Sequence, residues 1–228
     1  MKLPLPERVH QALRTQLLDG SLPPGTRLDY KQLAIELGVS TTPVREAVSR
    51  LASEGFVELV PRLGAVVRSL TRESAVEFYE VREAVETFAA LKAAERLSPR
   101  HIEALHQHLA TMTRIRDSFM AQGSTRLEQP ALTEFLDADL TFHRTVLQGS
   151  RNRALARTVE ESQLQARIFF ADRGIHDPQR VQLACDQHGE ILEALENRNP
   201  AAASDAMRNH IRTSLLFTLD HLESVLIQ

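Results

Sequence analysis

The 228-residue sequence has little of several residue types, and each shortage excludes a class of protein. It contains no Trp, two Tyr and nine Gly, and aromatic residues make up only 5% of the chain. Ala, Leu, Glu and Arg dominate instead, which predicts a mainly α-helical protein with little sheet. The single cysteine, Cys185, excludes an internal disulfide and indicates a reducing compartment.

Long apolar runs are also missing. No stretch approaches the roughly 20 residues of a membrane-spanning helix, and the start, MKLPLPERVH, has no apolar signal core. We therefore expect a cytoplasmic protein with no membrane partner. At this length the chain can hold two domains, each with its own core.

The sequence has no overall basic excess, because its formal net charge is −3. Residues 1–70 contain 9 Lys and Arg against 7 Asp and Glu, a net of +2, which leaves 18 against 23, or −5, for residues 71–228. The positive excess is small and confined to the N-terminal part. The placement of individual basic side chains must therefore matter more than bulk charge for any contact with nucleic acid.

Two short amphipathic segments joined by a tight turn occupy residues 29–56. Apolar residues recur at helical spacing in the first, from Tyr30 to Leu37, and Asp29 and Gln32 are spaced as a capping box. Gly38 supplies the C-terminal stop. The pattern predicts a short helix that ends in a tight turn.

The second segment predicts a helix that begins at Thr42, with Pro43 in its first turn. Two such helices are typical of the helix-turn-helix, whose second helix lies in the major groove. We expect Arg45 to contact a base edge because it projects from the first turn. The predicted buried face consists of Val44, Ala47, Val48 and Leu51, and the outward face of Arg45, Glu46, Ser49 and Arg50.

A further helix is predicted over residues 6–19, and a β-hairpin over residues 57–60 and 65–70. Arg62 and Gly64 lie at the hairpin tip, where they could approach a phosphate or the minor groove. The alternative is an ordinary surface hairpin. Its position directly after the helix pair favours a DNA-contacting wing.

The stretch VSTTPVREAVSRLASEGFVELVPRLGAVV, together with LPPGTRL upstream, is similar to the winged helix-turn-helix signature of the GntR family of bacterial transcription regulators. The resemblance covers roughly residues 6–70 and implies a DNA-binding domain over residues 1–70. Thr41 stands where many members carry a basic residue, which leaves the operator sequence open. The expected DNA contacts are Lys31, Ser40, Thr41, Thr42, Arg45, Arg50, Arg62 and Gly64.

Residues 71–228 show helical patterns and no strand pattern, so we place a domain boundary at residues 69–71. Ser98-Pro99, Asp177-Pro178 and Asn199-Pro200 each combine a capping side chain with a first-turn proline. An all-α domain follows. Its predicted helices span residues 71–97, 99–122, 129–148, 152–173, 178–197 and 200–226.

Four polar residues interrupt the apolar stripes of these helices: Asp139, His143, His188 and His210. A lone histidine on an apolar face is usually a hydrogen-bonded core residue, and a pair four residues apart is common in helices without metal. Four buried polar groups together need a common partner, however, and a divalent metal ion would satisfy them all. Both interpretations remain open on spacing alone. The other six histidines fit solvated or edge positions.

Residues 71–228 resemble the ligand-sensing FCD domain found in one branch of the GntR family, on the segments YEVREAVETFAALKAA, DADLTFHRTVL and DQHGEILEALENRNPAAASDAMRNHI. The resemblance implies an all-α antiparallel bundle of six or seven helices. The resemblance implies that Asp139, His143, His188 and His210 bind a divalent metal, zinc first, with nickel, manganese or iron as alternatives. It also implies that Arg82 binds a small carboxylate effector. An ion pair of Arg82 with a nearby Glu, on the surface or between helices, is the competing interpretation.

The sequence therefore predicts a homodimeric transcriptional regulator, in this family most often a repressor, that binds a pseudo-palindromic operator in double-stranded DNA and responds to a small organic acid. Two other classes compete with it. One is a metal-dependent enzyme, but the sequence offers no obvious general base for it. The other is an architectural DNA-binding protein whose helical half only dimerises.

Overall fold

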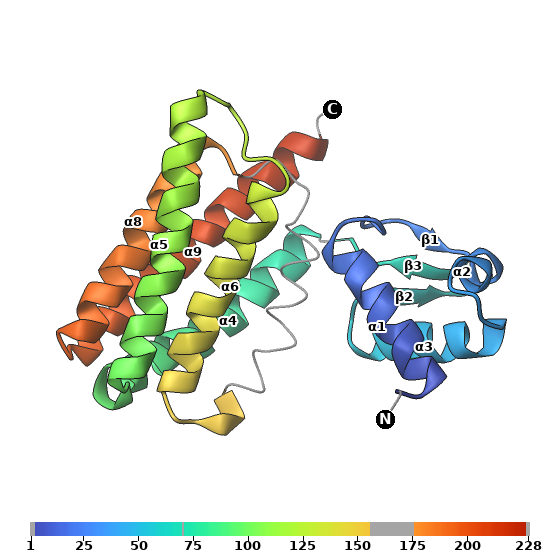
Figure 1. The fold of residues 1–228 in the computed structure, drawn as a ribbon, viewed down its shortest axis with the longest axis horizontal. Coiled ribbons are helices and arrows are strands. Elements are labelled where there is room, and N and C mark those ends of the chain that lie inside the picture. Colours follow the sequence, from blue (N-terminus) through green and yellow to red (C-terminus); the bar gives the residue numbers. More distant parts are fainter. Residues whose placement is uncertain (1–2, 70, 156–175, 227–228) are drawn as a thin grey trace. The chain divides into compact units, whose positions relative to one another are not determined.

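The computed structural model describes residues 3–69, 71–155 and 176–226, which form two compact units (Figure 1). One unit contains the described residues up to 69, and the other begins at Thr71. The first combines three helices with a small sheet, and the second is built from long helices, as the composition predicted. None of the helices in these ranges is long and apolar enough to cross a membrane.

The first unit follows the order of a winged helix-turn-helix. Its helices are α1 (Leu5–Leu18), α2 (Tyr30–Glu36) and α3 (Thr41–Ser53), and its strands are β1 (Arg27–Leu28), β2 (Val57–Val60) and β3 (Gly64–Val67). The strands form an antiparallel sheet in the order β1-β3-β2. The predicted apolar face of α3 is fully buried against α1 and α2, so one core fixes the position of the exposed α3 face.

Four details of this unit differ from the prediction. The strand β1 was not predicted; it forms because the chain after the Pro23-Pro24-Gly25 turn pairs with the free edge of β3. Helix α3 begins at Thr41, one residue early, and β3 covers Gly64–Val67 rather than residues 65–70. Asp29 caps α2 as expected, but the Gln32 amide bonds Glu36 instead of completing the capping box.

The second unit contains α4 (Arg72–Arg96), α5 (Pro99–Gln122), α6 (Ala131–Gly149), α8 (Pro178–Glu196) and α9 (Pro200–Leu226). Each agrees with its predicted range to within two residues. The predicted caps are also confirmed, since the side chains of Asp177 and Asn199 accept backbone N–H groups and Ser98 forms a capping box. The helix predicted over residues 152–173 lies almost wholly outside the described residues.

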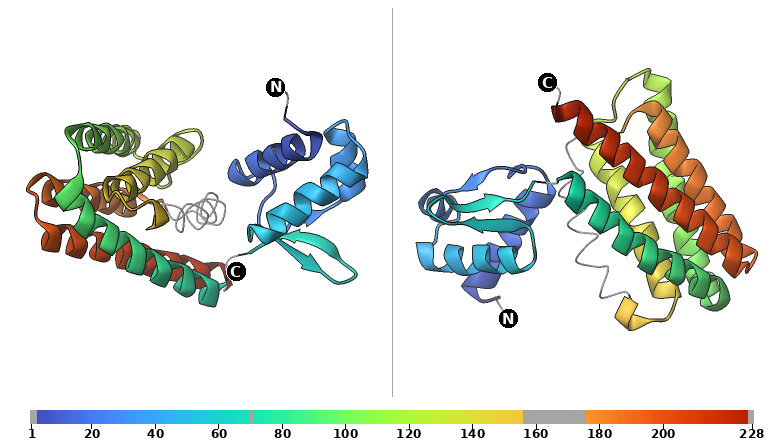
Figure 2. Two further views of the ribbon diagram at one scale, coloured as in Figure 1. Left: turned by 90° about the horizontal axis from the view of Figure 1, so that it is seen from below. Right: turned by 180° about the vertical axis from the view of Figure 1, so that it is seen from behind.

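Close packing of these helices places their polar residues in the interior. Figure 2 shows α4 beside α9, which is its most extensive partner, and α4 also packs on α6. A small residue permits the approach of α4 to α6, because a Cβ added to Gly149 would lie 2.2 Å from Leu97 Cδ2. The inward faces of α4, α6, α8 and α9 therefore meet around a common centre.

Candidate metal centre and DNA-binding surface

The four polar residues singled out in the sequence gather inside the bundle. Asp139 and His143 lie one turn apart on α6, His188 lies on α8 and His210 on α9. One ligand atom from each lies within 4.8 Å of all the others. The three imidazoles are almost completely buried, with exposed fractions of 1%, 0% and 4%, whereas Asp139 is partly exposed.

Each of the three histidines contacts a second partner through its Nδ1 atom. His188 Nδ1 lies 2.7 Å from the Ala184 carbonyl oxygen, and His210 Nδ1 lies 3.1 Å from Gln187 Oε1. His143 Nδ1 lies 2.6 Å from Glu86 Oε2, a short contact whose angles are poor for a hydrogen bond. An acceptor on one ring nitrogen fixes the tautomer and leaves the other nitrogen free for a metal, the usual arrangement around metal-binding histidines.

The remaining nitrogens point to the centre. His188 Nε2 lies 3.2 Å and His143 Nε2 3.9 Å from Asp139 Oδ1. Both Nε2 atoms are buried and lack a hydrogen-bond partner of good geometry. An unsatisfied buried nitrogen costs on the order of 1–3 kcal/mol, so two at one place favour a ligand that accepts their lone pairs.

The protonation states of His210 and Asp139 also favour metal binding. Burial, together with the neighbouring imidazoles of His188 and His143, holds the pKa of His210 well below its ordinary value, so the ring stays neutral. Burial alone would raise the pKa of Asp139, but the surrounding histidines outweigh it and lower that pKa, so the carboxylate stays charged. Neutral imidazoles and a carboxylate are the forms that bind zinc and related divalent ions, at about 2.0–2.2 Å. The four residues therefore fit such an ion.

Arg82 lies on the inward face of α4, only 8% exposed, with its guanidinium carbon 5.5 Å from the centre of the Tyr79 ring. Its Nε–H donates to Glu86 Oε1 at 2.7 Å. The Arg82–Glu86 ion pair is therefore present, as the alternative to a ligand-binding role required. It is buried inside the bundle, however, instead of lying on the surface or between helices.

Glu86 and Gln187 are residues of this site that the sequence interpretation missed, and Glu86 is the charged one. It is 1% exposed and contacts both Arg82 and His143. Burial alone would raise the pKa of its carboxyl, but Arg82 and His143 outweigh that effect and hold the pKa well below its usual range. The spacing of Arg82 and Glu86, four residues apart, was the only available sequence indication.

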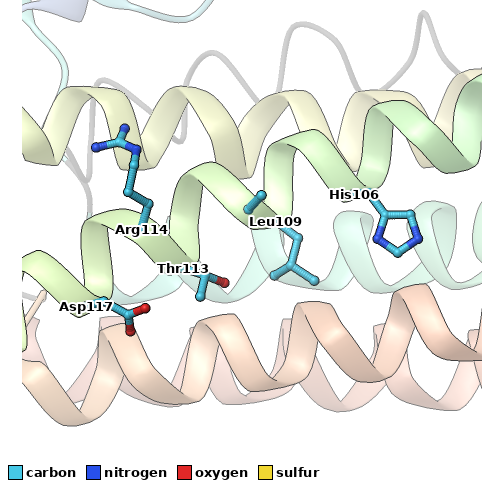
Figure 3. A pocket seen from close by; sticks show the side chains of 6 residues that line it. His106, Leu109, Thr113, Arg114 and Asp117 are labelled. Atoms are coloured by element: carbon cyan, nitrogen blue, oxygen red, sulfur yellow. The ribbon is translucent and has the colours of Figure 1, made fainter.

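Other polar residues of the chain lie apart from this centre. Cys185 packs among apolar side chains of α5 and α6, and burial raises its pKa to about 11, so the thiol behaves as a small apolar side chain. His10 is buried, not at a solvated or edge position as predicted, and its ring contacts the partly exposed Glu54 of the same unit. An open hollow runs along the outer side of α5 (Figure 3), lined by His106, Leu109, Ala110, Thr113, Arg114 and Asp117, and contains none of the metal-site residues.

The predicted DNA contacts lie on the helix-turn-helix and the hairpin of the first unit. Arg45 is exposed near the N-terminal end of α3, with its guanidinium 5.4 Å from the Tyr30 ring centre. Ser40 is the N-cap of α3 but makes no capping bond with its side chain. The hairpin tip turns through Arg62 and Gly64, with φ angles of 68° and 91°. The exposed members of the predicted set are Lys31, Ser40, Thr42, Arg45, Arg50, Arg62 and Gly64.

Two predicted contacts differ from the others. Arg50 is exposed, but its guanidinium is held by carboxylates of Glu7 and Glu54 within the same unit. Thr41 is partly buried as the first residue of α3 rather than part of the turn. Because Arg50 already has two anionic partners, a phosphate would have to compete with them for it.

Comparison with known proteins agrees with this architecture. Residues 5–67 match the family model of the bacterial regulatory proteins of the gntR family, and residues 77–213 match that of the FCD domain. The structure of Escherichia coli McbR/YncC is similar in fold, with a TM-score of 0.76 and 21% identity, over 96% of this chain and 100% of that one.

Two curated relatives are named as repressors. A probable D-xylose utilization operon transcriptional repressor of Paenarthrobacter nicotinovorans is 29% identical over 91% of this chain and 86% of its own length. The gluconate operon transcriptional repressor of Bacillus subtilis is 37% identical over 61% of this chain and 53% of its own length. The chain belongs to the GntR family, as a DNA-binding transcriptional regulator with an FCD domain and not an enzyme.

Proposed function

We propose that this regulator is a homodimeric repressor whose operator affinity is set by a small carboxylate bound beside a divalent metal ion in the helical unit. The observation that carries the proposal is the convergence of three buried imidazoles and Asp139 next to the buried guanidinium of Arg82. Repression is supported by the names of the relatives.

The metal is proposed to be zinc. Three imidazole nitrogens and one carboxylate oxygen suit zinc, while nickel, iron and manganese accept the same ligands. When bound, the ion supplies positive charge and open coordination positions for ligand oxygens. Asp139, His143, His188 and His210 would hold it, and the Nδ1 partners of the histidines would keep the rings oriented.

The effector is proposed to be an organic acid because the site then has a net positive charge. A divalent ion and Arg82 contribute three positive charges, while Asp139 and Glu86 contribute two negative ones. Burying an unbalanced charge is costly, so an anion is favoured. Glu86 uses the Nε–H of Arg82, and the terminal N–H groups of an arginine can still donate to a carboxylate. The named gluconate operon of one relative makes sugar acids a first class to test.

A dimer is proposed because one helix-turn-helix reads only a few base pairs. Two copies on a pseudo-palindrome give the specificity that a regulator needs. The proposed DNA-contacting residues are Arg45 and its exposed neighbours Lys31, Ser40, Thr42, Arg62 and Gly64. Thr41 and Arg50 are retained as weaker candidates, because the first is partly buried and the second is already paired.

The test has two stages. Zinc-loaded protein is screened against organic acids by thermal shift, since an acid at 100 times its dissociation constant adds about 2.7 kcal/mol of stability. Operator DNA is selected from a random library. It is then titrated with the protein in the presence and absence of the acid that raised the melting temperature. We expect a several-fold change in operator affinity, and the same acid should no longer act on Arg82→Ala, which keeps its metal and its DNA affinity.

Two results would contradict the proposal. If no acid stabilises the zinc-loaded protein, the helical unit only dimerises, as in the architectural alternative. If Arg82→Ala responds at the same acid concentration as the wild type, the carboxylate is bound elsewhere.

A further inference from the structure

Glu86 is a charged side chain enclosed by other residues of the bundle, with an exposed fraction of 1%. Its two carboxylate oxygens have different partners: Oε1 accepts from Arg82 Nε at 2.7 Å, and Oε2 lies 2.6 Å from His143 Nδ1. Burying an ionised carboxylate is expensive, and it is tolerated only when each oxygen is compensated. The position of Glu86 therefore requires both contacts.

The two partners of Glu86 have separate roles in the proposed function. His143 would bind the metal through Nε2, and Arg82 would bind the acid. Glu86 is the one residue among the described contacts that joins them directly. A purely structural ion pair with Arg82 would leave Oε2 with no reason to lie against the ring of a metal ligand.

We propose that Glu86 is a positioning residue that links the metal ligand His143 to the effector-binding Arg82. Its Oε2, 2.6 Å from His143 Nδ1, electrostatically favours the tautomer with the proton on Nδ1, which keeps Nε2 unprotonated and aimed at the ion. Its Oε1 holds Arg82 in place. A movement of Arg82 toward a bound acid then shifts Glu86 and with it His143, and by reciprocity the ion affects the arginine. This link rests on the proposed function for its physiological meaning, but its effect on metal binding can be measured without any acid.

The test uses full-length, metal-free protein and zinc itself as the probe. Zinc affinity is measured by competition with a chromophoric chelator for the wild type, Glu86→Gln and Glu86→Asp. Loss of the outer partner of a metal-binding histidine typically lowers affinity 10–100-fold, and we expect Glu86→Gln to fall in that range. Glu86→Asp, which keeps the charge on a shorter side chain, should lose less.

Glu83→Gln is the matched control, because it makes the same chemical change one turn earlier on α4. Glu83 pairs with Arg212 outside the metal centre, so its loss should leave zinc affinity unchanged. Nitrogen NMR of the His143 ring adds a readout that a general loss of stability would not move. In the wild type the proton should reside on Nδ1, and in Glu86→Gln the two tautomers should mix.

A double-mutant cycle tests the link to Arg82. If Glu86 transmits the influence of Arg82, Arg82→Ala should change zinc affinity a few-fold in the wild-type background, too little to empty the site in zinc-loaded protein, and should have no effect in the Glu86→Gln background. Should Glu86→Gln fail to fold, Glu86→Asp serves in its place in every comparison.

Wild-type zinc affinity and an unchanged His143 tautomer in both Glu86 variants would overturn the positioning role. Multiplicative effects in the cycle would overturn the link to Arg82. A wild-type protein that binds zinc but no acid would defeat the proposed function and leave these zinc measurements valid.

Discussion

Single residues determine what each unit can recognise, and Arg45 is the one that most directly concerns DNA. It is exposed at the start of α3, where helix-turn-helix proteins contact base edges. A bidentate contact of arginine with guanine is worth roughly 1–3 kcal/mol. Arg45→Ala should therefore weaken binding of the selected operator about tenfold or more, as measured by fluorescence anisotropy.

Stability should change little in that variant. The mutation removes only an exposed contact with Tyr30, which is worth about 0.5–1 kcal/mol at most. Arg100→Ala, which removes the same charge from an exposed position of α5, is the control. Equal operator affinity of Arg45→Ala and Arg100→Ala would show that Arg45 does not read bases.

The sequence was most informative about polar residues that lie on an otherwise apolar helix face. A histidine or aspartate on an apolar stripe is unusual, and the four residues that converge inside the bundle were singled out that way. Glu86 and Gln187 were missed because a polar residue on a helix with many Glu and Arg side chains is normally solvent-exposed. Their burial depends on which face of α4 or α8 turns inward, and that depends on packing between distant segments.

At the scale of elements, the contact of α4 with α6 depends on Gly149. A methyl group there would lie 2.2 Å from Leu97 Cδ2 and 2.9 Å from its Cγ, so Leu97 or the helix would have to move. Overpacking of this kind typically costs about 1–3 kcal/mol. Gly149→Ala should lower the free energy of unfolding by up to about 2 kcal/mol in urea denaturation, because the helix preference of alanine, about 1 kcal/mol, offsets part of the overpacking.

Gly189→Ala provides the comparison within the same unit. Gly189 lies inside α8, and an added Cβ would have no atom within 4 Å. Alanine is favoured over glycine inside a helix by about 1 kcal/mol, so this variant should be more stable than the wild type. Equal stability of the two alanine variants would show that α4 and α6 do not pack closely at Gly149.

Helix ends were predictable where the sequence carries local chemistry. Ser98, Asp177 and Asn199 each precede a proline, and all three begin helices in the structure. The strand β1 was missed because two residues carry no periodic pattern. Its pairing with β3 joins residues 27–28 to residues 65–66, and no local sequence feature reports such a contact.

At the scale of the whole molecule, acid should destabilise the helical unit of the metal-free protein. Burial lowers the pKa of His176 to about 4 and holds that of His210 well below its ordinary value. Unfolded histidine titrates near 6.5, so below that pH the unfolded chain binds more protons than the folded one. The free energy of unfolding should therefore decrease as the pH falls from about 6.5 to 4, by up to about 1.4 kcal/mol per pH unit for each group.

Urea denaturation of metal-free protein over this pH range measures the slope. His176→Gln cannot titrate at that position, so its slope should be shallower than that of the wild type. A stability independent of pH between 6.5 and 4 would contradict the burial of neutral histidines. In the metal-bound protein the loss should be steeper, because protonation of the imidazoles also releases the ion.

The central claim is that Asp139 and three histidines from α6, α8 and α9 bind one metal ion. Elemental analysis of purified protein, dialysed against zinc and then against buffer, tests it most directly. We expect one ion per chain in the wild type, and little metal and a lower melting temperature for the double variant His143→Ala/His210→Ala, because the ion stabilises the folded state. Equal metal content in the two proteins would contradict the claim.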